Sequence, residues 1–92
     1  MAKEKKWKWP LPIVEVEWLD CMGYDAWEPV DALLEKANRP GRMTHFTCGY
    51  LLESNDKHVI TIGSFSMSTE MCSDTTQIPR GAIVKIRRLK CE

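Results

Sequence analysis

Apolar and polar residues alternate along most of this chain, and a period of two is the pattern of β-strands that bury one face. Residues 13–20, IVEVEWLD, set two valines and a tryptophan on one face and two glutamates on the other. Residues 44–66 alternate in the same way and predict a β-hairpin whose turn is residues 54–57, SNDK. The closing segment, IPRGAIVKIRRL, predicts a further strand. We therefore expect a mostly β fold.

One segment has a different period. Residues 27–37, WEPVDALLEKA, predict a short helix, because a valine, two leucines and an alanine share one helical face. Asn38 is expected to cap this helix in a left-handed conformation, and Pro40 with Gly41 prevents its continuation. Residues 67–77, MSTEMCSDTTQ, are small and polar and predict a loop.

A chain of 92 residues forms one domain and buries only about 60% of the surface that its unfolded form exposes. The short strands and tight turns predict a small bent-sheet barrel over residues 13–92, with one short helix after the first strand. Residues 1–12 form an N-terminal arm, in which Trp7 and Trp9 are expected to fold back over the barrel or dock on a neighbour. Stacking of nucleic-acid bases on these two rings is the alternative. For the last strand we expect two faces, one with Ala82, Val84 and Ile86 and the other with Ile83, Lys85, Arg87 and Leu89.

The formal net charge is zero, but the charges are unevenly distributed. Residues 1–8 carry four lysines and one glutamate, residues 9–79 carry four basic and eleven acidic side chains, and residues 80–92 carry five basic and one acidic. Basic ends around an acidic middle suit an anionic ligand or head-to-tail self-association. For nucleic acid the predicted contacts are Lys5, Lys6, Lys8, Lys85, Arg87 and Arg88, although the lack of a basic surplus counts against that class.

Several classes of function are disfavoured by what the sequence lacks. There is no Cys-x-x-Cys pair, no Gly-x-Ser-x-Gly elbow and no phosphate-loop or dinucleotide glycine spacing. We expect no metal, no cofactor and no enzymatic activity. The basic first residues are not followed by an apolar stretch, and no apolar run approaches about 18 residues. The expected location is therefore the cytoplasm, with the four cysteines as thiols.

A small anionic ligand is the most specific expectation. Arg80 lies in a Pro-Arg-Gly turn, where a guanidinium can hold a phosphate through two hydrogen bonds and Gly81 allows close backbone approach. Aromatic rings elsewhere would stack on a base, and a second arginine would neutralise phosphate. The remaining predicted ligand-binding residues are Arg42, Trp18, Tyr24, Trp27 and Tyr50.

Two resemblances bear on fold and function. The segment IPRGAIVKI resembles the second signature of Sm-like proteins, and CGYLLESNDKHVITI is similar to their first, with Gly49 at the bend of the second strand and Asp56 in the following loop. The likeness covers residues 47–90 and implies an Sm-like or SH3-like barrel. It departs from the family where the Asp-x-x-Asn pattern of the RNA-contacting loop would be, because Val59 occupies the Asn position. The order of motifs along the whole chain looks like small accessory proteins of tailed phages and prophages.

These observations lead to one functional hypothesis and two alternatives. The expected function is that of a non-catalytic phage accessory binding module, homo-oligomeric through edge-strand pairing, acting in the host cytoplasm. It would bind a small nucleotide-like anion or a host factor to counter host defence. The alternatives are an Sm-like protein that binds RNA or single-stranded DNA, and a protein that antagonises a host enzyme by direct contact. No membrane partner is expected.

Overall fold

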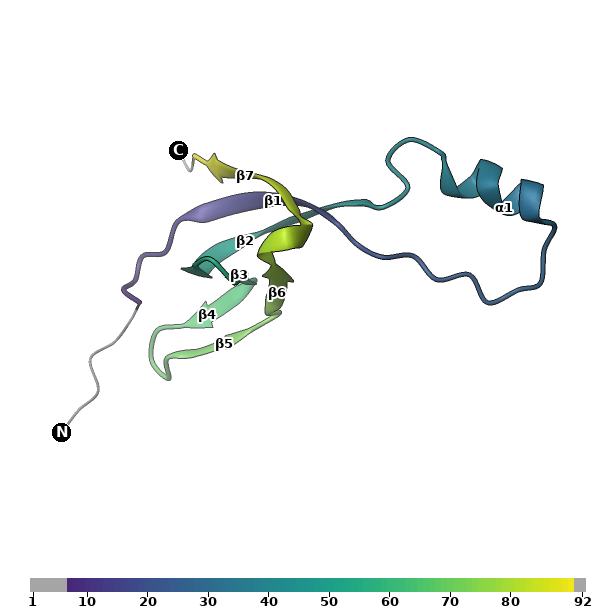
Figure 1. Cartoon of the computed structure of the whole chain (residues 1–92). Coiled ribbons are helices and arrows are strands. Elements are labelled where there is room, and N and C mark those ends of the chain that lie inside the picture. The colour runs from purple at the N-terminus through teal and green to yellow at the C-terminus, as the bar shows by residue number, and fades with distance from the viewer. Residues whose placement is uncertain (1–6, 91–92) are drawn as a thin grey trace.

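The computed structural model describes residues 7–90, and it confirms a mostly β chain with one short α-helix after the first strand (Figure 1). The elements are β1 (Ile13–Leu19), α1 (Val30–Ala37), β2 (Thr44–Ser54), β3 (His58–Ile62), β4 (Ser64–Ser66), β5 (Met71–Ser73), β6 (Thr76–Pro79), the 3₁₀ turn η1 (Arg80–Ala82) and β7 (Ile83–Leu89). The described helices are all too short and too polar to cross a membrane.

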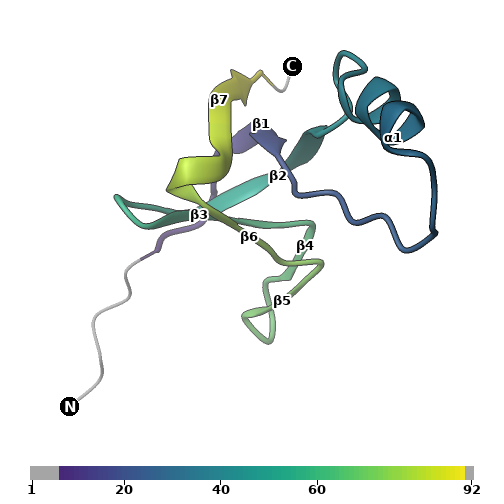
Figure 2. The same ribbon diagram turned by 45° about the vertical axis from the view of Figure 1, so that its right-hand side comes forward.

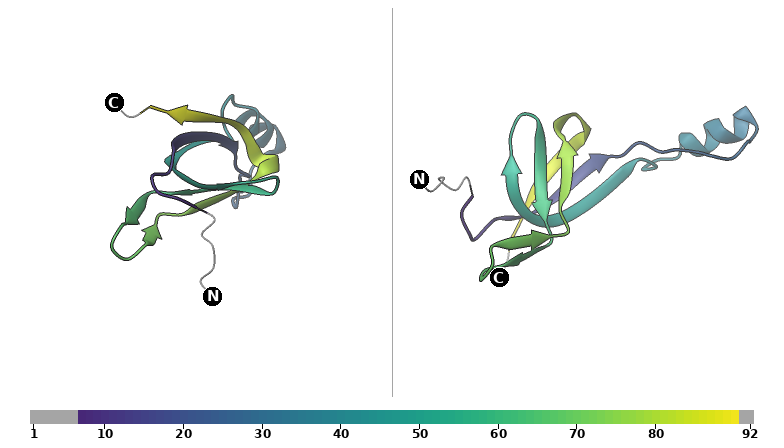
Figure 3. Two further views of the ribbon diagram at one scale, coloured as in Figure 1. Left: turned by 90° about the vertical axis from the view of Figure 1, so that its left-hand side faces the viewer. Right: turned by 90° about the horizontal axis from the view of Figure 1, so that it is seen from below.

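Five strands form one antiparallel sheet in the order β6-β3-β2-β1-β7, and β4 pairs with β5 in a small second sheet. β6 and β7 lie at opposite ends of this order, yet they follow one another in the chain through η1. The sheet is strongly bent, and Figure 3 shows the curvature along β2. The bend brings the β6–β7 connection next to the β2–β3 turn, where Arg80 N donates to the carbonyl of Lys57 (2.9 Å).

β3 approaches β2 closely at position 49. Gly49 lies in β2 opposite Val14 of β1. A Cβ at Gly49 would lie 2.9 Å from the carbonyl oxygen of Ile62 and 3.3 Å from Cβ of Thr61, so β3 passes too close for any side chain. This close approach explains why glycine occupies the position, whereas the bend implied there by the resemblance stays a prediction.

The core is small. Among residues 7–90, five apolar side chains are almost fully buried, namely Val14, Val16, Val59, Ile62 and Ile78. Half-buried residues pack around the main cluster, namely Trp18, Leu51, Ala82, Ile83 and Ile86. The alternation predicted for β1 is confirmed, because its two valines and its tryptophan face this core.

The predicted faces of β7 were wrong at two positions. Ile83 packs against the core, whereas Val84 is 55% exposed. The cause is a register shift between Glu17 and Trp18 of β1, which pairs Trp18 with Ile83 and leaves Val84 without a partner in the ladder. A bulge of this kind changes which side chains face the core, and period-two counting along β7 alone cannot reveal it.

The loop predicted for residues 67–77 was also wrong in part. This stretch contains β5 and the start of β6, and β6 pairs with β3 from His58↔Pro79 to Thr61↔Thr76. Ile78, which is completely buried, anchors the strand to the core. The polar residues before it form an edge strand because β3 offers unpaired backbone groups, a tertiary effect that overrides local composition.

The connection between β1 and β2 leaves the sheet entirely. Residues 20–43, here called the β1–β2 extension, run outward and return with α1 at the far end (Figures 1 and 2). The helix begins at Val30, three residues later than predicted, and none of its residues is buried. Asn38 caps it with φ −92° rather than in the predicted left-handed conformation, and its side-chain amide donates to the Leu34 carbonyl (2.7 Å). The chain's Cα radius of gyration is 17.5 Å, against about 12 Å for a compact domain of this length.

The aromatic residues of the N-terminal arm fold back onto the sheets, as predicted. Trp9 stacks on Phe65 of β4 with ring centroids 4.6 Å apart and planes within 11°. Trp7 meets the same ring edge-on at 5.4 Å, and Tyr50 of β2 lies 5.1 Å from Trp9. Each of the four rings is half-buried. The cluster therefore joins the arm and both sheets.

Candidate functional site

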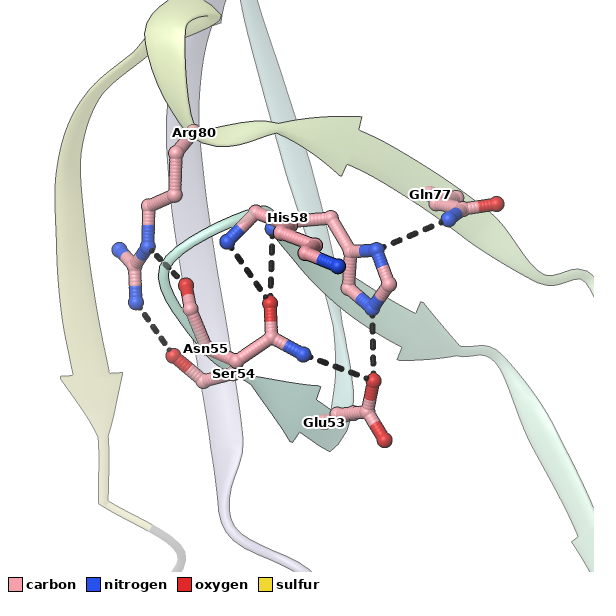
Figure 4. Close-up of polar contacts among 7 residues, drawn as sticks. Glu53, Ser54, Asn55, His58, Gln77 and Arg80 are labelled. Atoms are coloured by element: carbon pink, nitrogen blue, oxygen red, sulfur yellow. Dashed lines mark hydrogen bonds and ion pairs between the residues drawn. The ribbon is translucent and has the colours of Figure 1, made fainter.

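Arg80 holds the corner where the sheet bends back on itself (Figure 4). The residue opens η1, and its side chain reaches across to the turn between β2 and β3. Its Nε donates to the carbonyl of Asn55 (2.7 Å) and its Nη2 donates to Oγ of Ser54 (2.6 Å). Two of the guanidinium's donors are thus committed to the protein's own turn, and the bonds connect residues 25 and 26 positions apart.

The same turn is organised from within by Asn55. Its Oδ1 accepts hydrogen bonds from the backbone amides of Lys57 (2.9 Å) and His58 (3.0 Å), which confirms the Asx turn predicted for SNDK. Its side-chain amide also donates to Glu53 Oε1 (3.1 Å). The turn therefore has hydrogen bonds of its own besides those that Arg80 donates to it.

His58 is fixed on both sides of its ring (Figure 4). Nε2 lies 2.6 Å from Oε1 of Glu53, and Nδ1 lies 3.0 Å from the side-chain amide of Gln77. These two contacts hold the imidazole in one orientation. An open pocket beside it is lined by Lys57, His58, Gln77 and Pro79. Glu53, His58 and Gln77 were missed in the sequence, because their partners lie on different strands.

We expect Arg80→Ala to lower the free energy of unfolding by about 1–2 kcal/mol, because two charge-assisted hydrogen bonds are lost at a partly exposed site. Arg88→Ala is the matched control, since the side chain of Arg88 is exposed and makes no hydrogen bond or ion pair within the described chain, and it should stay within about 0.5 kcal/mol of the parent. Urea denaturation followed by circular dichroism measures both. Equal stability of the two variants would show that Arg80 does not hold the corner.

The other predicted ligand-binding residues lie in three further places. Tyr24, Trp27 and Arg42 belong to the β1–β2 extension, where Arg42 Nε donates to the Tyr24 hydroxyl (3.2 Å). Trp18 is in the core cluster, and its indole N–H donates to Oγ1 of Thr47 (2.9 Å). Tyr50 contacts the ring of Trp9. Within one chain, none of these three places forms a common site with Arg80 and Gly81. A Cβ at Gly81 would meet no atom within 4 Å, so close packing does not require glycine there.

The predicted nucleic-acid contacts are only partly available. Arg87 donates from Nη1 to Glu15 (3.0 Å) and from Nη2 to Glu17 (2.6 Å). The hydrogen bond that Arg87 donates to Glu17 is the main cause that raises the pKa of the Arg87 guanidinium. Lys85 lies opposite Glu17 in the ladder, whereas Lys8 and Arg88 are exposed. Lys5 and Lys6 lie outside the described residues.

Three cysteines, Cys21, Cys48 and Cys72, are free and exposed, and Cys91 lies outside the described residues. Across residues 7–90, no three side chains of histidine, cysteine or acidic type come together as metal ligands would.

The feature that sequence reasoning missed is the exposure of the apolar residues in the β1–β2 extension. Trp27 is fully exposed, Val30 is 70% exposed and Leu34 is 53% exposed. Trp27 also lines an open pocket between the outgoing limb of the extension and α1, together with Tyr24, Asp25, Ala26, Glu28 and Leu33. Helical spacing did predict an apolar face on α1. It could not indicate that Val30 and Leu34 on that face stay exposed among residues 7–90.

Comparison of the chain with protein-family models, with curated proteins and with solved structures finds no match. The geometry therefore offers two surfaces from which a function can be argued. One is the corner held by Arg80, and the other is the β1–β2 extension.

Proposed function

We propose that this protein is a non-catalytic binding module and that the β1–β2 extension is its binding element, completed by a protein partner. One observation carries the proposal: α1 buries none of its residues in the chain to which it belongs. The sequence hypothesis of a host factor or a self-partner is compatible with such an element. The resemblance to tailed-phage accessory proteins and the role against host defence stay predictions from the sequence.

The physical reason lies in the stability of short helices. A helix of eight residues is marginal in water on its own, because nucleation costs more than a few hydrogen bonds return. Most helices in proteins are stabilised by packing their apolar face, and here Val30 and Leu34 face solvent. A partner that covered this face would supply the missing stabilisation.

The extension is also prepared for docking by its own polar contacts. Lys36 Nζ pairs with Glu28 (3.0 Å) and lies 4.6 Å from the centre of the Tyr24 ring. Arg42 contacts the same ring from the returning limb, at 5.5 Å from its centre. These contacts hold the two limbs and α1 in one arrangement while Trp27 points outward. A fixed, exposed tryptophan is the residue type that most often dominates protein interfaces.

The corner at Arg80 supports a ligand-binding function less well. A nucleotide-like anion, or the RNA of the Sm-like alternative, would compete with Asn55 and Ser54 for the Arg80 donors. Because two N–H groups of Arg80 already donate to the protein's own turn, they favour a structural role for this residue. The proposal for the extension needs no rearrangement of the fold.

We also propose that the bent sheet is a small open barrel of the Sm-like or SH3-like kind. The order of strands supports this, because its two edge strands, β6 and β7, are consecutive in the chain and meet at η1. The close approach of β3 at Gly49 supports it too, since that residue occupies the place at which the resemblance implies a bent strand.

A shortened chain tests whether the extension serves binding rather than folding. Asp20 N donates to the Met43 carbonyl (2.9 Å), so an Asn-Gly turn in place of residues 21–42 would close a two-residue hairpin there. We expect the melting temperature to stay within about 5 °C of the parent, because no core residue is removed. The Trp27→Ala variant of the full chain is the matched control and should be equally stable. Loss of the folded sheet in the shortened chain would mean that the extension is structural, and the proposal would fail.

A further inference from the structure

β7 is a long strand with one side unpaired. Among the described residues it pairs only with β1, and it contains no proline over its seven residues. Val84 and Leu89 are exposed on it, at 55% and 40%. The opposite edge, β6, has four residues and ends at Pro79, which lacks an amide donor. A long, partly apolar edge such as β7 can pair with another strand. The next step is to find which segment pairs with it.

The charges of β7 disfavour a second β7 as that partner. Residues 83–90 include Lys85, Arg87, Arg88 and Lys90 and no acidic residue. Two copies of this strand placed side by side would set like charges against one another, which is destabilising. The complementary partner is an extended segment that is acidic, carries apolar side chains and has free backbone groups.

The chain itself contains such a segment. Residues 21–28, CMGYDAWE, precede α1 and make no backbone–backbone hydrogen bond within the described chain. They include the exposed apolar residues Met22 and Trp27, and the exposed Asp25 has no ion-pair partner within residues 7–90. At eight residues, the segment is one residue longer than β7.

The segment does not reach β7 of its own chain. β1 and β7 are antiparallel, so the extension leaves the sheet at the end where β7 begins. From there it runs outward, away from the rest of β7 (Figures 1 and 2). A second molecule is therefore needed to bring the two together.

We propose that residues 21–28 of one copy add as a strand to the free edge of β7 in a second copy, in a reciprocal exchange that forms a symmetric dimer. The inference rests on the proposed function, because it names the partner that completes the extension. The exchanged segments satisfy the backbone groups that both surfaces leave unpaired. They also bring Asp25 of each copy against Arg88 of the other.

A charge-swap experiment tests the pairing. One variant of the full chain carries Arg88→Glu, and the other carries Asp25→Lys. Each variant alone places like charges at both contacts of the dimer and should self-associate at least about tenfold more weakly than the parent. A one-to-one mixture restores opposite charges at both contacts, so it should form a heterodimer with nearly parental affinity. Sedimentation velocity and native mass spectrometry over the micromolar range measure all four samples.

Amide hydrogen exchange separates strand addition from docking by side chains alone. Residues 21–28 and the outward amides of β7 should become protected as the concentration of the parent rises. A parent that stays monomeric, or a mixture that behaves like its two components, would overturn the inference. A dimer that persists in the chain lacking residues 21–42 would overturn it as well. The proposed function fails by a different measurement, namely loss of the folded sheet when the shortened chain is studied as a monomer in dilute solution.

Discussion

Replacing Ile78 with alanine is expected to lower the free energy of unfolding by about 2–5 kcal/mol, the largest loss of any single substitution considered for this protein. Ile78 has no exposed surface and lies in the β6 edge strand, where it packs with Val14, Val16 and Val59. Only five apolar side chains are almost fully buried among the described residues, so one of them is a large share of the core. Domains of this size have roughly 5–14 kcal/mol of stability in total.

Chemical denaturation of the purified protein measures this effect. Val84→Ala is the matched control, because Val84 is aliphatic and near in sequence but 55% exposed, and it should change stability by about 0.5 kcal/mol or less. Ile78→Val should lie between the two, at about 0.5–1.5 kcal/mol. If Ile78→Ala lost no more stability than Val84→Ala, the buried position of β6 would be wrong.

The second large effect is expected at Gly49. An alanine there would place its Cβ 2.9 Å from the Ile62 carbonyl oxygen, a distance that neither backbone can relieve without moving. Overpacking of this kind costs about 1–3 kcal/mol, which corresponds to a fall in melting temperature of about 5 °C or more.

Gly81→Ala is the control for Gly49→Ala, because the added methyl group at position 81 meets no atom within 4 Å. Thermal unfolding followed by circular dichroism compares the two variants under the same conditions. We expect Gly81→Ala to melt within about 3 °C of the parent. Equal melting temperatures for both variants would show that β2 does not need glycine at position 49.

The sequence predicted those parts of the fold that depend on neighbours in the chain. The alternation of β1 is local, and its valines face the core as expected. The turn at Asn55 is local too, because its side chain bonds to amides two and three residues ahead. In both cases the residues that decide the structure lie within one short segment.

The errors arise where a distant strand decides the outcome. The exposure of Val84 follows from a bulge opposite β1, some 66 residues earlier in the chain. β6 forms because β3 offers it an edge, although the residues around Ile78 are mostly polar. The spacing of apolar residues within one segment carries no information about either partner.

The candidate site shows the same difference between features set by local sequence and features set by distant strands. Arg80 and the turn of residues 54–57 were each singled out, but their contact spans 25 positions and depends on the bend of the sheet. The apolar face of α1 was predicted from spacing, whereas its lack of a covering layer follows from the path of the extension. Predicting what a face will meet requires the tertiary arrangement.

The position of β1 in the sheet has a consequence for how the protein is made. β1 lies between β2 and β7, and its register with β7 joins Ile13 to Leu89. Translation adds roughly 5–20 residues per second, so β1 waits several seconds for its second neighbour. During that interval Val14 and Val16 lack the cover that Ile83 and Ile86 of β7 give the core. A nascent chain that has not yet released β7 therefore exposes the edge of β1, an unpaired strand edge of the kind to which chaperones and other chains can bind.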